Sequence, residues 1–201
     1  MTDLPQSRAE RRGLSTESRR FLERYALVFV WILLIAGFSI AMPTSFFNWG
    51  NFSIMFASYA PAALLALAII VPLCSGDYDL SVAATMTLSS GMIAVLNVWN
   101  GVPIGLCVLL VLLMGVFVGL FHALFIVYFR IPSLVVTLGT TSLMSGIVQL
   151  ITKSSTIGGI DTGLIMAVVG GRLFGVPYAF YYVLAAAAVL WYVFDYTPIG
   201  R

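Results

Sequence analysis

The sequence has very little charge for its length. Of its 201 residues, 9% are charged and 61% are hydrophobic, whereas ordinary soluble domains carry roughly 25% charged residues. A soluble domain of this size cannot bury so much apolar side chain. The shortage of charge therefore excludes a soluble globular domain and indicates an integral membrane protein.

The sequence also lacks the motifs of common catalytic sites. It has no Walker-type phosphate loop, no Gly-x-Ser-x-Gly elbow and no Cys/His spacing typical of a metal site. The two cysteines, Cys74 and Cys107, lie in or beside apolar segments, where a free cysteine behaves as a small buried hydrophobe. We therefore expect no catalytic residue, no metal and no cofactor.

Long apolar blocks fill most of the chain instead. Each block is long enough to cross roughly 30 Å of hydrocarbon as a helix. The fold predicted is an all-α, polytopic transmembrane helical bundle. Its six expected spans are residues 25–42, which Pro43 ends, then 53–74, 80–99, 104–129, 133–151 and 178–194.

Residues 1–24 form a polar segment without apolar periodicity, which predicts a mostly disordered tail. Its six arginines could bind nucleic acid, but in front of an apolar span they are typical of the positive-inside rule. With the N-terminus in the cytoplasm, eight of the ten basic residues fall inside, and only Lys153 and Arg172 fall outside. We therefore expect a cytoplasmic tail (1–24), a membrane domain (25–201), contact with lipid and no nucleic-acid partner.

The expected spans differ in character. Spans 80–99 and 133–151 are rich in serine, threonine and glycine, which allow close helix packing and hydrogen bonds between helices. These two spans should therefore lie inside the bundle. Pro72 should kink or end its helix, because it cannot donate to the carbonyl of Ala68. The outer segment 153–177 can fold as a lid or a hairpin, and the sequence does not choose between them.

Asp77 and Asp79 lie between two apolar blocks, where charge beside hydrocarbon is costly. Asp79 precedes the third span, so its carboxylate can cap that helix by accepting from the N–H of Ser81 or Val82. A role in a transport path is the second possibility. Binding of a cation by both carboxylates, as in a metal-dependent transferase, is the third.

His122 is the single histidine of the chain and lies within the fourth span. It can relay protons or contact a ligand. Alternatively, it forms a hydrogen bond to a neighbouring helix and has only a structural role.

Three stretches carry a resemblance to a known family. They are Gly76-Asp77-Tyr78-Asp79-Leu80-Ser81-Val82-Ala83, Ile131-Pro132-Ser133-Leu134-Val135-Val136-Thr137-Leu138-Gly139-Thr140 and Thr197-Pro198-Ile199-Gly200-Arg201. In this order they resemble motifs of the permease subunits of bacterial monosaccharide ABC importers, of the ribose, xylose and arabinose type. Asp77, Ala83 and the pair His122-Ala123 depart from the usual family pattern.

The resemblance implies a permease subunit, not an enzyme, in the bacterial inner membrane. Its implied partners are a cytoplasmic ATP-binding subunit, a second permease subunit and a periplasmic sugar-binding protein. The implied candidates for the translocation path or its conformational change are Gly76, Asp77, Asp79, Ser81, His122, Thr137, Gly139 and Thr140. Thr197, Gly200 and Arg201 would begin the loop that couples to the ATPase.

Two further expectations follow. An ion-coupled secondary transporter using Asp77, Asp79 and His122 is the alternative function, but such carriers place carboxylates deep in a span, whereas we expect these at an inner boundary. The family continues past Arg201 with a coupling helix and more spans. We therefore expect the chain to be a truncated or fragmentary permease that does not drive transport alone.

Overall fold

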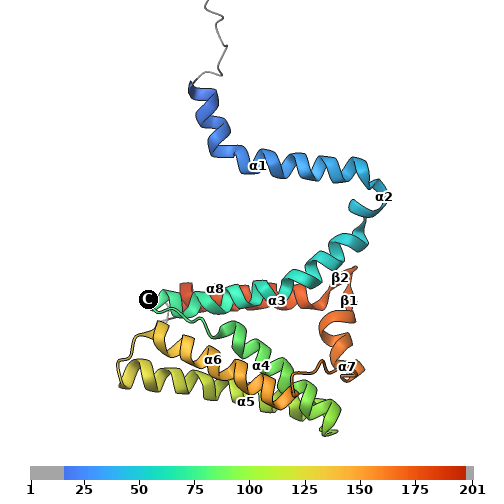
Figure 1. Ribbon diagram of the computed structural model, residues 1–201. Helices are drawn as coiled ribbons and strands as arrows, with labels where there is room; N and C mark the ends of the chain where they lie inside the picture. Colours follow the sequence, from blue (N-terminus) through green and yellow to red (C-terminus); the bar gives the residue numbers. More distant parts are fainter. Residues whose placement is uncertain (1–15, 198–201) are drawn as a thin grey trace, which may run out of the picture. The chain divides into compact units, whose positions relative to one another are not determined.

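The computed structural model describes residues 16–197 of the chain. The chain divides into two units, residues 1–51 and 52–201, and each is described by itself. Within the described residues, six helices are long and apolar enough to cross a membrane, which confirms the predicted all-α, polytopic architecture (Figure 1).

The first unit contains α1 (Thr16–Ala41), α2 (Pro43–Phe46) and the first turn of α3. Pro43 ends the first span as expected, and it then occupies the start of α2, where its missing N–H costs nothing. The expected disorder up to residue 24 is wrong from Thr16 onward, because α1 already begins there. Five of its nine residues up to Arg24 are Glu or Arg, which favour helix. Residues 1–15 lie outside the described residues.

The second unit holds the other long helices, and their ends lie within a few residues of the predicted ones. Two of them finish in a π-helical turn, labelled η. The elements are α3 (Trp49–Cys74), α4 (Val82–Ala94) with η1 (Val95–Trp99), α5 (Ile104–Ala123) with η2 (Leu124–Tyr128), α6 (Ser133–Thr152) and α8 (Tyr178–Tyr196).

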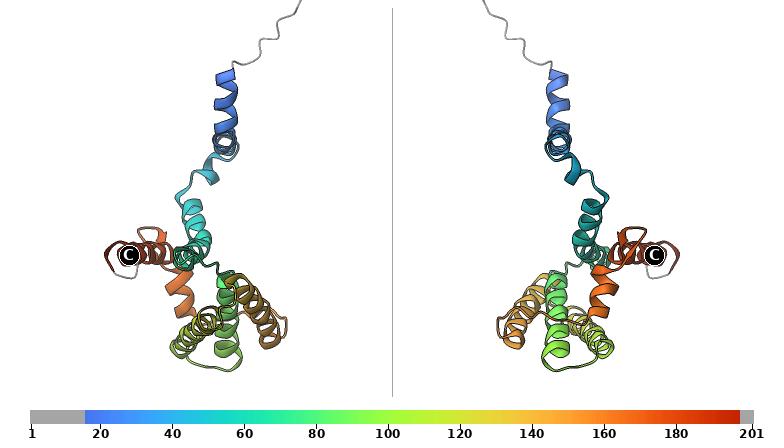
Figure 2. Two further views of the ribbon diagram at one scale, coloured as in Figure 1. Left: turned by 90° about the vertical axis from the view of Figure 1, so that its left-hand side faces the viewer. Right: turned by 90° about the vertical axis from the view of Figure 1, so that its right-hand side faces the viewer.

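Helix α4 packs between α5 and α6, and its most extensive contact is with α6. Figure 2 shows these three helices grouped together. Ala84 and Leu88 of α4 form a buried cluster with Met144 of α6. Gly91 brings the two helices close, since a Cβ there would lie 3.6 Å from side-chain atoms of Val148 and Thr152. The prediction that these two spans pack inside the bundle is confirmed for this group.

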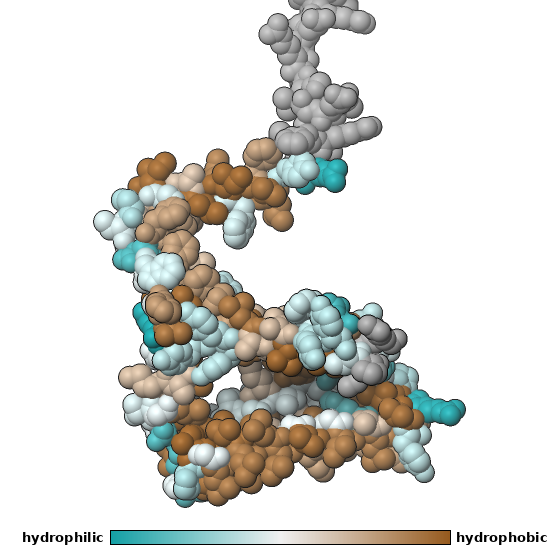
Figure 3. Space-filling model, turned by 180° about the vertical axis from the view of Figure 1, so that it is seen from behind, coloured by the Kyte–Doolittle hydropathy of each residue, from teal (hydrophilic) through white to brown (hydrophobic). Residues whose placement is uncertain are grey.

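The outer surface of the second unit is strongly apolar (Figure 3). Along α5, large hydrophobic side chains such as Leu112, Phe117 and Leu120 are more than half exposed. In lipid this exposure has no hydrophobic cost, because acyl chains are as apolar as leucine. The surface therefore fits a helix group surrounded by membrane.

Residues 153–177 fold as a short helix followed by a hairpin. The elements are α7 (Thr162–Ile165), η3 (Met166–Gly170), β1 (Arg172–Leu173) and β2 (Val176–Pro177), and the two strands are antiparallel. Phe174 and Gly175 connect the strands with φ of 52° and 80°, and two positive φ values define a type I′ turn. Of the two possibilities that the sequence left open, the structure has the hairpin.

Two hydrogen bonds show which connections share an end of the second unit. The N–H of Tyr78 donates to Ser133 Oγ at 3.3 Å, which joins two connections predicted to be on the inner face. The N–H of Asp161 donates to Asn97 Oδ1 at 3.0 Å, which joins two connections predicted to be on the outer face. The alternating order of the spans is therefore consistent with the predicted topology.

We predict that Gly91→Leu destabilises the helix group by about 1–3 kcal/mol, the usual cost of overpacking, whereas Gly91→Ala is tolerated. An alanine Cβ makes only ordinary contact with α6, but a leucine side chain would collide with Val148 and Thr152. Gly115→Leu is the control, because no atom lies within 4 Å of a Cβ there. Thermal unfolding in detergent measures the effect. Equal loss at both glycines would contradict it.

Candidate functional site

The site is built around the break between α3 and α4. Helix α3 continues two residues past Pro72 and ends at Cys74. The N–H of Asp77 donates to Pro72 O and the N–H of Gly76 donates to Leu73 O, both at 3.0 Å. With Gly76 at φ +80°, this pattern is a Schellman C-cap. Gly76, a predicted path residue, therefore closes a helix in the structure.

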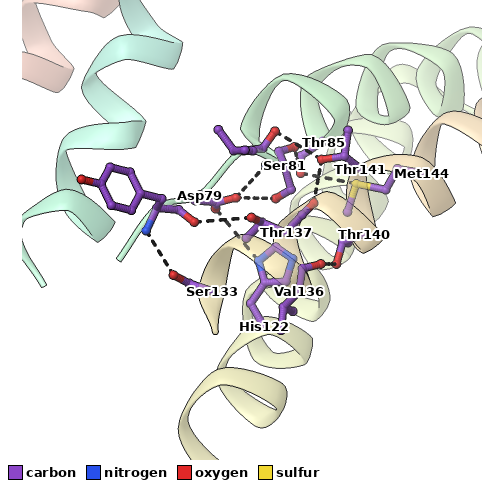
Figure 4. A network of polar contacts seen from close by, with 12 residues as sticks. Asp79, Ser81, Thr85, His122, Ser133, Val136, Thr137, Thr140, Thr141 and Met144 are labelled. Atoms are coloured by element: carbon purple, nitrogen blue, oxygen red, sulfur yellow. Dashed lines mark hydrogen bonds and ion pairs between the residues drawn. The ribbon is translucent and has the colours of Figure 1, made fainter. Parts of the chain in front are cut away.

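After this cap, residues 77–81 have no regular secondary structure and run alongside the start of α6. Three hydroxyls of α6, spaced four residues apart, bond to the backbone of this segment. Ser133 Oγ accepts from Tyr78 N–H at 3.3 Å. Thr137 Oγ1 shares its proton between Tyr78 O at 3.4 Å and Leu134 O at 3.5 Å. Thr141 Oγ1 shares its proton between Leu80 O at 3.2 Å and Thr137 O at 2.7 Å. Figure 4 shows these contacts, and we call Ser133, Thr137 and Thr141 the hydroxyl ladder.

The three hydroxyls contact two residues of the segment. Ser133 and Thr137 meet the N–H and the carbonyl of Tyr78, and Thr141, one turn further along α6, meets the carbonyl of Leu80. Irregular backbone inside a membrane protein is tolerated where neighbouring groups satisfy its hydrogen bonds in this way.

Asp79 lies between the levels of Thr137 and Thr141, roughly 6–12 Å along α6 from Ser133 at 1.5 Å per residue. Apolar periodicity locates a helix start in the sequence, but not its level relative to neighbouring helices. Val82 begins α4 about two turns past the start of α6. The expected place of both carboxylates at an inner boundary stays a prediction.

The two oxygens of the Asp79 carboxylate have different surroundings. Oδ1 accepts from Ser81 N–H at 2.8 Å and from Ser81 Oγ at 2.6 Å. The predicted bond to the Ser81 N–H is present, but the prediction that Asp79 caps the helix is wrong, because Ser81 is the N-cap of α4 and makes no side-chain capping bond. Asp79 instead fixes the turn that precedes the helix. Oδ2 faces His122 Nδ1 of α5 at 4.0 Å, which is too long for a hydrogen bond.

His122 is 8% exposed. Within the described part of the chain, its Nε2 is buried without a hydrogen-bond partner. The structural alternative, a hydrogen bond to a neighbouring helix, is not seen among these residues, and Asp79 is the polar group that His122 faces. Leaving a buried polar atom unpaired costs about 1–3 kcal/mol. A residue kept in this position is therefore a good candidate for function.

Asp79 and His122 line a cavity of about 390 Å³ between the end of α3, the irregular segment, α5 and the start of α6. Its volume lies within the range of small-molecule sites, roughly 300–1,000 Å³. Its polar lining comes from Ser75, Asp77, Tyr78, Asp79, His122, Ser133 and Thr137. We call it the inner cavity.

The structure brings together four of the predicted site residues around the inner cavity, namely Asp77, Asp79, His122 and Thr137. Ser81 is almost fully buried behind them and holds the Asp79 carboxylate. These residues come from the irregular segment, α5 and α6, so the predicted site is a spatial cluster as well as a set of motifs.

Other predicted residues lie elsewhere. Gly139 and Thr140 line a separate cavity of about 220 Å³ beside Phe121 and Phe125, and the Thr140 hydroxyl donates to Val136 O within its own helix. Thr197 ends α8, where its hydroxyl donates to Val193 O. Gly200 and Arg201, predicted to begin a coupling loop, lie outside the described residues.

Sequence reasoning missed the function of two ladder residues. Thr141 was recognised only as a small polar residue, and Ser133 only as part of a motif. The signal was present in the four-residue spacing of Ser133, Thr137 and Thr141, which places them on one face of a helix. Among the described residues, no group of three or more His, Cys, Asp or Glu side chains could hold a metal ion, so the metal hypothesis for Asp77 and Asp79 gains no support.

We predict that Asp79→Ala destabilises the turn before α4 by about 0.5–1.5 kcal/mol for each hydrogen bond lost, because the carboxylate accepts from both the N–H and the hydroxyl of Ser81. Asp79→Asn should be nearly neutral, because its amide oxygen can still accept from Ser81. Asp77→Ala is the matched control, since no side-chain hydrogen bond of Asp77 is present in the described structure. Hydrogen exchange of the amides from Ser81 to Thr85 measures the effect. Unchanged exchange in Asp79→Ala would contradict the role of Asp79 in the turn.

Comparisons with known proteins place these features in context. The chain is 30% identical to the ribose import permease protein of Haemophilus influenzae over 90% of this chain and 57% of the relative. It is 25% identical to the xylose transport system permease protein of the same species over 70% of this chain and 37% of the relative. It is 32% identical to the autoinducer 2 import system permease protein of Enterobacter sp. over 68% of this chain and 39% of the relative.

The chain thus spans between about a third and somewhat more than half of the length of these relatives. No solved structure matches it. A family model described as "Branched-chain amino acid transport system / permease component" matches residues 51–201, which include the whole inner cavity. The chain therefore belongs to the family of branched-chain amino acid transport system permease components.

Proposed function

We propose that this chain is the membrane-spanning permease subunit of an ABC importer and forms part of the path for a monosaccharide or a related small polar solute. The family supports a permease component, and the names of the relatives refer to ribose, xylose and autoinducer 2. The implied partners are a cytoplasmic ATP-binding subunit, a second permease subunit and a periplasmic sugar-binding protein. The site of action is the bacterial inner membrane.

The observation that carries this proposal is the inner cavity at the connection between the two spans α3 and α4, where polar side chains gather in a mostly apolar lining. In transporters, helix ends and irregular backbone supply polar groups to solute sites. Here, the connection places two carboxylates, a histidine and several hydroxyls inside an otherwise apolar helix group. In this proposal Asp77, Asp79, His122 and Thr137 line the path, and Ser81 holds Asp79 in position.

A permease must also adopt two packings around its path. The irregular segment bonds to α6 through the hydroxyl ladder, whereas it faces α5 only across the 4.0 Å gap between Asp79 and His122. No hydrogen bond is described between α5 and the segment, so the two can separate without losing one. We propose that this boundary opens and closes during transport, and that residues from Thr197 onward lead to the coupling contact with the ATPase.

An ion-coupled secondary transporter remains the second candidate, because Asp79 and His122 lie close together inside the helix group. Such carriers use intramembrane carboxylates and histidines as proton relays. The names of the relatives give this candidate no support, so the ABC importer is preferred.

We predict an N-terminus in the cytoplasm, from the excess of basic residues on that side. Single cysteines at Asn100 and Gly159, in a variant without Cys74 and Cys107, should react with a membrane-impermeant maleimide added to spheroplasts. A cysteine at Thr197 should react only after the membrane is opened. Labelling of Thr197→Cys from outside would overturn the orientation.

Transport itself is tested in membrane vesicles that contain the chain with its ATPase, permease and binding-protein partners. We expect uptake of labelled D-ribose or D-xylose that requires ATP and continues when a protonophore collapses the proton gradient. The control is an ATPase variant that binds but does not hydrolyse ATP. Uptake that needs the proton gradient and not ATP would favour the ion-coupled candidate and overturn the proposal.

A further inference from the structure

We propose that Asp79 Oδ2 and the His122 imidazole form a subsite that binds a hydroxyl group of a polyhydroxylated solute in the inner cavity. This inference rests on the proposed function and specifies the chemistry of its site. The subsite joins the irregular segment before α4 to α5, the two parts that face each other across the cavity.

Only one of the two oxygens of the Asp79 carboxylate makes hydrogen bonds within the local turn. Oδ1 accepts both hydrogen bonds from Ser81, which fixes the orientation of the side chain. Oδ2 makes no hydrogen bond in the described structure and faces His122. The side chain is 26% exposed and lines the inner cavity, so a small molecule in the cavity can contact it.

His122 is the complementary partner. Its side chain is nine-tenths buried, and neither ring nitrogen makes a hydrogen bond among the described residues. A carboxylate opposite Nδ1 favours the tautomer with a proton on that nitrogen, because Nδ1–H then points at negative charge. The pair thus offers an acceptor, Oδ2, and a donor, Nδ1–H, separated by 4.0 Å.

A hydroxyl group fits this arrangement. An oxygen atom placed 2.7–3.0 Å from both atoms completes two normal hydrogen bonds across a 4.0 Å gap. A hydroxyl donates to Oδ2 while it accepts from Nδ1–H, and a single group can do both. With a proton on Nδ1, the pair therefore matches a group that both donates and accepts, as a hydroxyl does.

The rest of the inner cavity suits further hydroxyls on the same molecule. Asp77, Ser133 and Thr137 also line it, and all three supply oxygen atoms that accept from O–H donors. A solute with hydroxyls on adjacent carbons can bond to the Asp79–His122 pair and to one of these groups together. This chemistry describes a sugar or another polyol.

The single histidine of the chain makes the test direct. The full chain is labelled with ¹³C,¹⁵N-histidine and assembled with unlabelled partners in lipid nanodiscs, so that the only labelled ring is His122. Titration with D-ribose and with D-xylose should move its ring signals in a saturable way. Glycine betaine, which has no hydroxyl group, is the solute control and should leave them unmoved.

Asp79→Asn separates binding from folding. The amide oxygen can keep both bonds to Ser81, while the amide nitrogen replaces the acceptor Oδ2 with a donor. We expect this variant to weaken the apparent sugar affinity by about tenfold or more, the loss typical of a hydrogen bond to a charged group, with unchanged thermal stability. Gly146→Ala is the matched control and should bind as the unmodified chain does, because Gly146 does not line the inner cavity and an added Cβ there has no atom within 4 Å.

The outcomes distinguish this inference from the proposed function. Ring signals that do not respond to either sugar, or that respond equally in Asp79→Asn, would overturn the subsite even if ATP-driven uptake is intact. Saturable shifts that Asp79→Asn weakens would support the subsite even if ATP-driven uptake is absent, and only the importer assignment would then fail.

Discussion

The structure depends on how the connection between α3 and α4 is held against α6. Residues 77–81 have no regular secondary structure, and an unpaired peptide group beside apolar helices is expensive. Three hydroxyls of α6 accept from or donate to the backbone of Tyr78 and Leu80. These bonds allow an irregular segment to persist there. The same segment carries Asp77 and Asp79, which line the inner cavity. The hydrogen bonds from its backbone to α6 hold these two side chains in place.

Two further contacts set the limits of this connection. At its beginning, the Schellman cap with Gly76 closes α3 and turns the chain away from the helix axis. At its end, Asp79 holds Ser81 just before Val82 begins α4. Helix α4 is then fixed to α6 by apolar packing around Leu88 and Met144 and by the close approach at Gly91. The residues that line the inner cavity and the residues that pack α4 against α6 therefore lie at different levels along the two helices.

Much of this organisation follows from the sequence, because length and apolar content decide whether a helix can span a membrane. The spans, the interior position of α4 and α6 and the bond from Asp79 to Ser81 were all predictable in this way. The level of Asp79 was not, since it depends on where α4 starts relative to α6. The facing of Asp79 and His122, 43 residues apart in sequence, depends on helix packing in the same way. The tail was predicted to be disordered up to residue 24, but α1 begins at Thr16. Here the helix propensity of the local residues was given too little weight.

The hydroxyls that hold the segment have a second acceptor inside their own helix. Thr137 Oγ1 lies 3.5 Å from Leu134 O and Thr141 Oγ1 lies 2.7 Å from Thr137 O. If the segment moves away from α6, both hydroxyls therefore keep a hydrogen-bond partner, and only the carbonyls of Tyr78 and Leu80 lose theirs. The cost of releasing the segment falls on its own backbone and not on α6.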